Sequence, residues 1–258
     1  MVQALFGVGI AERGADKSSK NNVWERKAGA LREYNTRALL QTGAIPLLKV
    51  EHFKAYNFEG AFRGMRNPKA SWHLSDSVFH PESGALVQLG ENDRRLALTL
   101  ATAGSDHGKF LRQIFVSVDI TAPDYWWKEM DTYKVATVAN STSTMHKLTA
   151  RPLTPADFSW DELNPDRENL LQHLNGLIER YKSLVKETPD QAKPVWRMLI
   201  QDLPMSYQFT RTWSANYETL RNIYHARKGH KLSEWHLFCQ AIETLPFAEL
   251  ITATRGKG

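Results

Sequence analysis

The stretch from Ile120 to His146 contains the densest set of side chains that could do chemistry. Its sequence, ITAPDYWWKEMDTYKVATVANSTSTMH, combines aromatic rings, lysines and many hydroxyl groups. Pro123 suits the first turn of a helix, where its missing N–H costs nothing, and Thr121 just ahead of it is a plausible cap. The pattern predicts a helix from about Pro123 to Tyr133 with one polar face. That face holds Tyr125, Lys128, Glu129 and Thr132.

The residues after this helix have the composition of a loop that could bind a polar ligand. From Val135 the chain reads VATVANSTSTM, and Ser, Thr and Asn side chains favour turns because they compete for the local backbone. The helix would deliver Lys134 to the mouth of a loop rich in hydrogen-bond donors, which suits a phosphate or a nucleobase. The alternative is that Trp126 and Trp127 belong to the core and that the Ser/Thr-rich segment is an ordinary loop.

Three arginines near the C-terminus, Arg211, Arg221 and Arg227, form a second candidate set. A guanidinium group grips a phosphate or a carboxylate with two parallel hydrogen bonds, which lysine cannot copy. The alternative places these arginines on solvated helix faces. A further polar set is equally consistent with ligand binding and with a surface turn. It comprises Asn67, Ser71, Ser75, Asp76 and Ser77.

Composition places the chain among soluble globular proteins. It has 258 residues, of which 42% are hydrophobic and 24% charged. No apolar run approaches the length needed to cross a bilayer, and we expect neither a signal peptide nor a membrane partner. The single cysteine, Cys239, excludes an internal disulfide and fits the cytoplasm; in an apolar helix it is more often core than nucleophile. The net charge of +5 suits small anionic ligands, and without a dense basic stripe nucleic acid is not an expected partner.

We expect an α+β fold, with a mixed sheet flanked by helices and a helical C-terminal half. Residues 1–47, a tail plus a helix over about 23–43, are expected to lie outside the core, and residues 48–258 to form a single domain. The segment 45–50 is either a strand or a linker. Further helices are expected over about 91–103, 166–186, 194–203 and 232–245, a strand over 111–120, and a long surface connection over 150–166.

Several motifs that would define a reaction are missing from the sequence. We find no phosphate-binding glycine loop, no HExxH, no CxxC pair and no GxSxG. P-loop hydrolysis, zinc chemistry and serine-hydrolase chemistry therefore lack support, and no metal site is predicted.

The order of features resembles the flavin-dependent thymidylate synthases, and more closely a phage or prophage-type branch of them. The resemblance covers roughly Glu91 to Leu250. In that family a helix ends in glycine before an acidic-His pair and a strand, and an Ala-Pro step leads through Arg-Gln-Trp to an Arg-His-Arg triplet. The matching residues here are Gly104, Asp106, His107, Ala122, Pro123, Lys128, Glu129, Met130, Thr132, Tyr133, Lys134 and the loop 140–146, followed by Leu203, Pro204, Trp213, Asn216, Leu220, Asn222, Arg227, His230, Glu234 and Trp235.

The resemblance implies a thymidylate synthase-like fold and a methyltransferase that moves a one-carbon unit from a folate to dUMP, with hydride from reduced FAD. It implies that Arg227 grips or polarises the pyrimidine and that Lys128, Glu129 and Ser143 line the same pocket. The residues implied to bind the flavin are His107, Thr132, Tyr133, Lys134, Asn216, Glu218 and His230. The family assembles as a homotetramer with its sites between chains, and it uses no protein nucleophile.

The triplet is the position where this chain departs from the family. Thr132, Tyr133 and Lys134 stand where the family has Arg-His-Arg, so that only Lys134 is a conservative replacement. This departure motivates a rival hypothesis, a non-catalytic nucleotide-binding or phage-host interaction protein that keeps the fold. A nucleic-acid-binding protein is the least favoured alternative, because the eight tryptophans are dispersed instead of interleaved with lysines.

Overall fold

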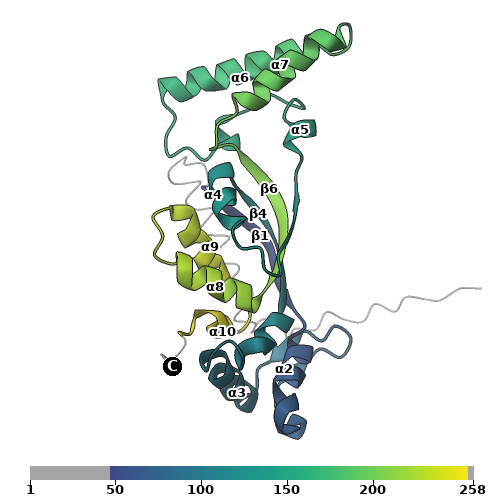
Figure 1. Ribbon diagram of the computed structural model, residues 1–258, viewed down its shortest axis with the longest axis vertical. Coiled ribbons are helices and arrows are strands. Elements are labelled where there is room, and N and C mark those ends of the chain that lie inside the picture. Colours follow the sequence, from purple (N-terminus) through teal and green to yellow (C-terminus); the bar gives the residue numbers. More distant parts are fainter. Residues whose placement is uncertain (1–46, 255–258) are drawn as a thin grey trace, which may run out of the picture.

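A four-stranded antiparallel sheet forms the centre of the molecule. The computed structural model describes residues 47–254, and the predicted tail and helix within residues 1–46 lie outside that range. The strand order is β1 (Lys49–Tyr56), β4 (Phe115–Pro123), β6 (Gln208–Asn216) and β5 (Val138–Ser141). Helices α4 (Asp124–Met130), α8 (Tyr217–Arg227) and α9 (Ser233–Glu243) cover one face of this sheet (Figure 1).

The two central strands show why the sheet forms. Along β4 the apolar side chains of Val116, Val118 and Ile120 alternate with partly exposed polar ones, which is the period-2 pattern of a half-buried strand. On the polar face, Thr121 Oγ1 and Thr210 Oγ1 lie 2.7 Å apart across β4 and β6. On the covered face, large aromatic side chains from the helices pack against the sheet. They include Trp126, Trp127, Trp235 and Phe238, and the Trp126 and Trp235 rings lie 4.7 Å apart.

A helical hairpin projects from one end of the sheet and has its own apolar core (Figure 1). It consists of α6 (Pro165–Leu184) and α7 (Pro189–Gln201). The Asn164 side chain caps α6 by accepting a hydrogen bond from Arg167 N at 3.0 Å. The core under the hairpin contains Leu148, Leu153, Phe158, Trp160, Leu174, Leu177, Ile178, Val195 and Leu199. The expectation that α7 starts at Pro194 is wrong, because Pro189 occupies the first turn and Pro194 lies inside the helix.

The opposite end of the molecule contains α2 (Phe58–Arg66), the β2 (Val78–Phe79) and β3 (Leu86–Gln88) hairpin, and α3 (Glu91–Thr102) (Figure 1). Most of the polar set predicted near residues 67–77 holds α3 in place. Asp76 accepts hydrogen bonds from Asn92 N at 2.9 Å and Asp93 N at 3.0 Å, and so caps α3. Buried Asp93 in turn accepts from Arg66 Nε and from Ser75 Oγ, both at 2.8 Å. These side chains therefore have a structural role.

Burial and hydrogen bonding oppose each other in setting the Asp93 pKa. Burial raises the pKa, but the hydrogen bonds from Ser77, Ser75 and Arg66 outweigh it, so that the pKa lies below its ordinary value. The carboxylate is thus held in its charged form at the start of α3.

The predicted α+β class, with a sheet flanked by helices and a helical C-terminal half, is confirmed. Within the sheet, the three strand pairings are antiparallel and not mixed. Of the segment 45–50, residues 49 and 50 begin β1, and residues 45 and 46 lie outside the described range. Helix α4 begins one residue later than predicted, because Pro123 ends β4 in an extended conformation, and it ends at Met130, three residues earlier than predicted. Thr121 is therefore a strand residue and not a cap. Among residues 47–254 no helix combines the length and apolarity that a membrane span requires.

Candidate functional site

The carboxylate of Glu129 is the centre of a polar cluster at the C-terminal end of α4. Its Oε2 atom accepts a hydrogen bond from Arg227 Nη1 at 2.7 Å and another from Trp235 Nε1 at 2.7 Å. His230 Nε2 lies 3.4 Å from the same oxygen. Three segments that are far apart in sequence, the ends of α4 and α8 and the start of α9, thus meet at one oxygen atom. We call Glu129, Tyr133, Arg227, His230 and Trp235 the Glu129 cluster.

Arg227 is held on several sides within this cluster. Its Nε donates a hydrogen bond to Tyr133 Oη at 2.9 Å. Its guanidinium carbon lies 4.7 Å from the centre of the Trp235 ring and 5.5 Å from that of Tyr133, which is cation–π geometry. The side chain is 18% exposed, and within residues 47–254 its Nη2 group makes no hydrogen bond. Arg227 therefore presents free N–H donors from a rigid position.

Local sequence explains how these side chains come to face one another. Arg227 is the last residue of α8, where the helix dipole favours a cation. His230 lies in the short turn before α9, and its Nδ1 accepts a hydrogen bond from Leu232 N at 3.2 Å. Because Nδ1 is an acceptor, the proton of the neutral imidazole lies on Nε2, directed at Glu129.

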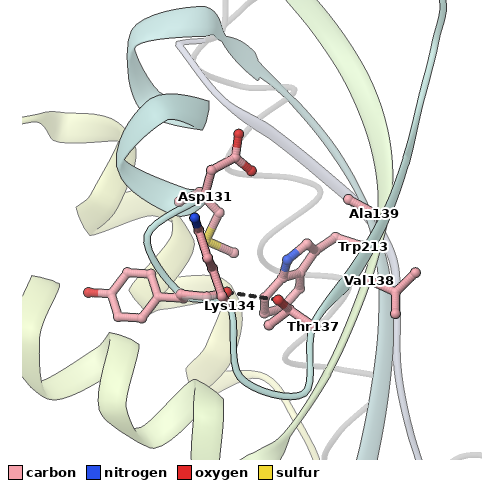
Figure 2. Close-up of a pocket in the computed structure, with 8 residues that line it drawn as sticks. Asp131, Lys134, Thr137, Val138, Ala139 and Trp213 are labelled. Atoms are coloured by element: carbon pink, nitrogen blue, oxygen red, sulfur yellow. Dashed lines mark hydrogen bonds between the residues drawn. The ribbon is translucent and has the colours of Figure 1, made fainter.

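A pocket of about 300 Å³ lies next to the Glu129 cluster. Figure 2 shows Asp131 and Lys134 on the segment that leaves α4, with Trp213 facing them from β6. The lining is formed by Met130, Asp131, Tyr133, Lys134, Thr137, Val138, Ala139 and Trp213. Tyr133 belongs to both the pocket and the Glu129 cluster, so the two adjoin at this residue.

The charges of this pocket are unequally compensated. Asp131 accepts a hydrogen bond from Arg211 Nη1 at 2.7 Å, and the Arg211 guanidinium lies 4.3 Å from the centre of the Trp127 ring. Lys134 forms no ion pair with any described residue. The pocket therefore offers one uncompensated cation beside a buried indole, which suits an anionic group attached to an aromatic ring.

Hydrogen bonds to the backbone fix the loop that carries Lys134. Thr137 Oγ1 donates to Tyr133 O at 2.8 Å, and Thr219 Oγ1 of α8 donates to Val135 O at 3.1 Å. The sequence predicts an open loop around Ser143, and this prediction is wrong. Residues 138–141 form β5, and Ser143 caps α5 (Thr144–Lys147). The strand carries this end of the segment away from the pocket, since Ser141 lies about 10 Å along it from Val138.

The structure brings together five of the predicted site residues: Glu129, Tyr133, Lys134, Arg227 and His230. Thr132 is beside them and donates a hydrogen bond to Glu129 O at 2.7 Å. Lys128 points elsewhere, with its Nζ 3.0 Å from Asp124 Oδ2. His107 lies in an exposed corner between α3 and the short 3-10 helix Gly108–Gln113.

Asn216 and Glu218 lie at the opposite end of α8 from Arg227. Glu218 and Arg227 are nine positions apart on the helix, which corresponds to about 14 Å. Asn216 caps the helix by accepting a hydrogen bond from Thr219 N at 2.9 Å, and Glu218 is buried in the first turn. The family resemblance implies that both face a flavin; in this chain the Asn216 side chain also caps α8.

The three C-terminal arginines do not converge, contrary to the prediction. Arg221 is buried, and its guanidinium donates to Leu250 O and to Ala253 O, both at 2.6 Å. Arg211 is on strand β6 and not on a helix face, and it contacts Asp131. Arg227 alone of the three belongs to the Glu129 cluster.

Two further kinds of site are not supported by the geometry. Cys239 is buried and belongs to the core, as predicted, and this burial raises the pKa of its thiol to about 12. In the part of the chain that the structure describes, no group of three or more His, Cys, Asp or Glu side chains is arranged to hold a metal ion.

Trp235, Asp131 and Trp213 were not predicted as site residues. The Trp235 ring lies in the core, but a buried indole N–H needs an acceptor, and this requirement could have pointed to a carboxylate. Asp131 belongs to the same mid-chain stretch as Glu129, and its carboxylate, three positions before Lys134, could have been noticed in the sequence.

Comparison with known proteins identifies the fold. No protein-family model matches the sequence, and no curated protein matches it. Solved structures do match, and they show that the chain has the fold of thymidylate synthase X and of a UMP/dUMP methylase.

The matching structures include thymidylate synthase X from Helicobacter pylori, crystallised with FAD and dUMP. The chain is 18% identical to it with a TM-score of 0.53, and the match covers 80% of this chain and 96% of the other. A second structure of that enzyme with FAD and dUMP gives 16% identity and a TM-score of 0.55, with 81% and 99% covered. The UMP/dUMP methylase PolB from Streptomyces cacaoi, bound with 5-Br dUMP, gives 14% identity and a TM-score of 0.50, with 80% and 95% covered. At these identities the likeness establishes a shared fold.

Proposed function

We propose that this chain is an enzyme that binds a deoxyuridine-type nucleotide and transfers a one-carbon unit to its base, with FAD as cofactor. The observation that carries the proposal is the position of Arg227, which is fixed by Glu129 and by Tyr133, a residue that also lines the pocket containing Lys134. The fold likeness supports it, because it spans nearly the whole length of enzymes crystallised with dUMP or 5-Br dUMP.

The charges of the site favour one orientation of the nucleotide. Glu129 neutralises Arg227, and the pair together presents N–H donors and a carboxylate acceptor, which match the carbonyl and N–H groups of a uracil edge. Lys134 keeps its full charge and is the better partner for a phosphate. We therefore place the base at Arg227 and the phosphate toward Lys134.

The pocket residues fit part of a flavin. Trp213 supplies an apolar wall and Thr137 a hydroxyl group, which suits a ring edge of FAD. A volume of about 300 Å³ is at the lower end for ligand sites, so one chain would hold only part of this cofactor. We place the remainder against a second copy in a homotetramer, as the family resemblance implies.

The chain's own residues would orient the reactants and stabilise charge. Cys239, the single thiol, is buried and protonated, so we assign no covalent nucleophile. Arg227 would polarise a base carbonyl, while Tyr133 and Trp235 hold its guanidinium in place. Bound reduced FAD would supply hydride, and a folate would supply the carbon. We further propose that the chain belongs to the phage or prophage-type branch and acts in the cytoplasm.

One observation favours the non-catalytic alternative. Tyr133, the central residue of the altered triplet, uses its hydroxyl group to bind Arg227. A nucleotide sensor would need this rigid cluster but no turnover.

Expression in a thymidine-requiring bacterium separates the two functions. Growth without thymidine, lost in the Arg227→Ala variant, supports the enzyme. Absence of growth from a well-expressed protein that still binds dUMP in vitro would instead support the sensor.

A further inference from the structure

A buried carboxylate lies directly behind the Glu129 cluster. Glu234, in the first turn of α9, is 3% exposed. Its Oε1 atom accepts a hydrogen bond from Tyr125 Oη, and Ser159 Oγ lies 3.3 Å from the same oxygen. Tyr125 Oη and Ser159 Oγ are 3.0 Å apart, so the three polar groups close a triangle. A buried carboxylate is stable only when donors compensate its lost hydration, so these two hydroxyl groups are required.

Two members of this triangle are joined directly to the Glu129 cluster. Tyr125 and Glu129 are four residues apart on α4 and therefore lie on the same helix face. Glu234 immediately precedes Trp235, whose indole N–H donates to Glu129. The bond between Tyr125 and Glu234 thus joins the same two helices as the bond between Trp235 and Glu129, about one turn earlier along α4 and at the neighbouring residue of α9.

The third member ties the triangle to the helical hairpin. Ser159 lies between Phe158 and Trp160, whose rings stack 4.2 Å apart in the core under α6 and α7. Ser159 N also donates to Ser206 O at 2.8 Å, which leads into β6. The triangle is therefore the point where α4, α9 and the base of the hairpin are held together by polar contacts.

Burial and Glu234 both raise the pKa of Tyr125 well above its ordinary value. The tyrosine hydroxyl group consequently stays protonated, and so remains a donor to Glu234, at neutral pH.

We propose that Glu234, together with Tyr125 and Ser159, positions the Glu129 cluster for its ligand, by fixing the distance between the helix that carries Glu129 and the helix that carries Trp235. This inference rests on the proposed function where it concerns the nucleotide. None of the three side chains has to touch the ligand, because each acts through Trp235 or Glu129.

The chain provides a matched control for a test. Tyr224 of α8 donates a hydrogen bond to Glu243 Oε1 of α9 at 2.7 Å, an exposed tyrosine–carboxylate bond outside the triangle. Tyr125→Phe and Tyr224→Phe each remove one hydroxyl group and one such bond. A purely general loss of helix contacts would affect both variants alike, whereas the proposal assigns the effect to Tyr125.

The decisive experiment follows the indole N–H signal of Trp235 by NMR in the full chain without ligand, assigned with a Trp235→Phe variant, and measures dUMP binding by calorimetry. In Tyr125→Phe we expect the Trp235 signal to move and dUMP affinity to fall about tenfold, since a buried carboxylate has lost a donor. In Tyr224→Phe both should match the wild type. If Tyr125→Phe does not fold, Ser159→Ala removes the second donor and gives the same test.

The outcomes separate this inference from the proposed function. An unmoved Trp235 signal in both variants overturns the inference, whatever the ligand does. A moved signal in a chain whose wild type does not bind dUMP supports the positioning of the cluster and refutes the proposed nucleotide. Equal effects of Tyr125→Phe and Tyr224→Phe also overturn the inference, because the role would then be general stability.

Discussion

Replacing Arg227 with lysine tests the geometry of the site while keeping its charge. Arg227 reaches Glu129 through Nη1 and Tyr133 through Nε, and its planar group lies over Trp235. A lysine ammonium can replace the contact with Glu129 but cannot supply the second donor or the planar stacking. The variant thus keeps the positive charge and removes the planar guanidinium group, so the two contributions can be measured separately.

The size of the effect follows from the lost contacts. The hydrogen bond to Tyr133 is worth about 1 kcal/mol and the stacking over Trp235 about 0.5–1 kcal/mol. The free energy of unfolding should therefore fall by about 2 kcal/mol, which lowers the melting temperature by about 4–8 °C in a chain of this size. Loss of charge-assisted contacts to the ligand should weaken dUMP binding by about 1–3 kcal/mol, or roughly 5- to 150-fold.

Calorimetric titration of dUMP and thermal unfolding of the same preparations provide the assay. Arg94→Lys is the matched control, because Arg94 forms an exposed ion pair with Glu249 on the outside of the molecule. It should change neither quantity. Unchanged dUMP affinity in Arg227→Lys would refute the assignment of this residue to the ligand, and a lowered melting temperature alone would leave it a purely structural role.

Three further predictions concern stability and reactivity. Asn216→Ala should cost about 1 kcal/mol in urea unfolding because α8 loses its cap, while Asn216→Asp, which can still accept from Thr219 N, should be nearly neutral. Asp93→Asn should destabilise the protein by about 3 kcal/mol at pH 7. The pKa of Asp93 in the folded protein lies below its ordinary value of 3.8, so the difference in stability between variant and wild type should shrink as the pH falls below about 4. Acid unfolding of both proteins measures this difference. Cys239, with its pKa raised to about 12, should react with a thiol reagent at pH 8 only after denaturant is added.

Local patterns were sufficient for much of the fold. The apolar stripe of α6 and the inward side chains of α9 follow helical periodicity, and β4 follows β-branched alternation. Strand β6 was not predicted, because its partners β4 and β5 lie far away in sequence and its mixture of aromatic and polar residues resembles a helix face. Pro123 suited the start of a helix and the end of a strand equally well, and pairing with Gln208 decides between them.

The site was predictable to the extent that its residues lie in one run. Glu129, Tyr133 and Lys134 belong to the mid-chain stretch 120–146. Arg227 was a candidate by residue type alone, because a guanidinium group can bind a phosphate or a carboxylate with two hydrogen bonds. The bond from Trp235 to Glu129 joins residues 106 positions apart, which no local pattern reports. Ser143 is close in sequence but distant in space, because an intervening strand carries it away from the pocket.

The central claim is that one site holds a deoxyuridine nucleotide beside a flavin, and the visible absorption spectrum tests it most directly. The purified chain is incubated with FAD, freed of unbound cofactor, and then titrated with dUMP. We predict flavin absorption bands that stay with the protein and shift as dUMP is added. A protein that emerges colourless and whose melting temperature is unaffected by dUMP would contradict the claim.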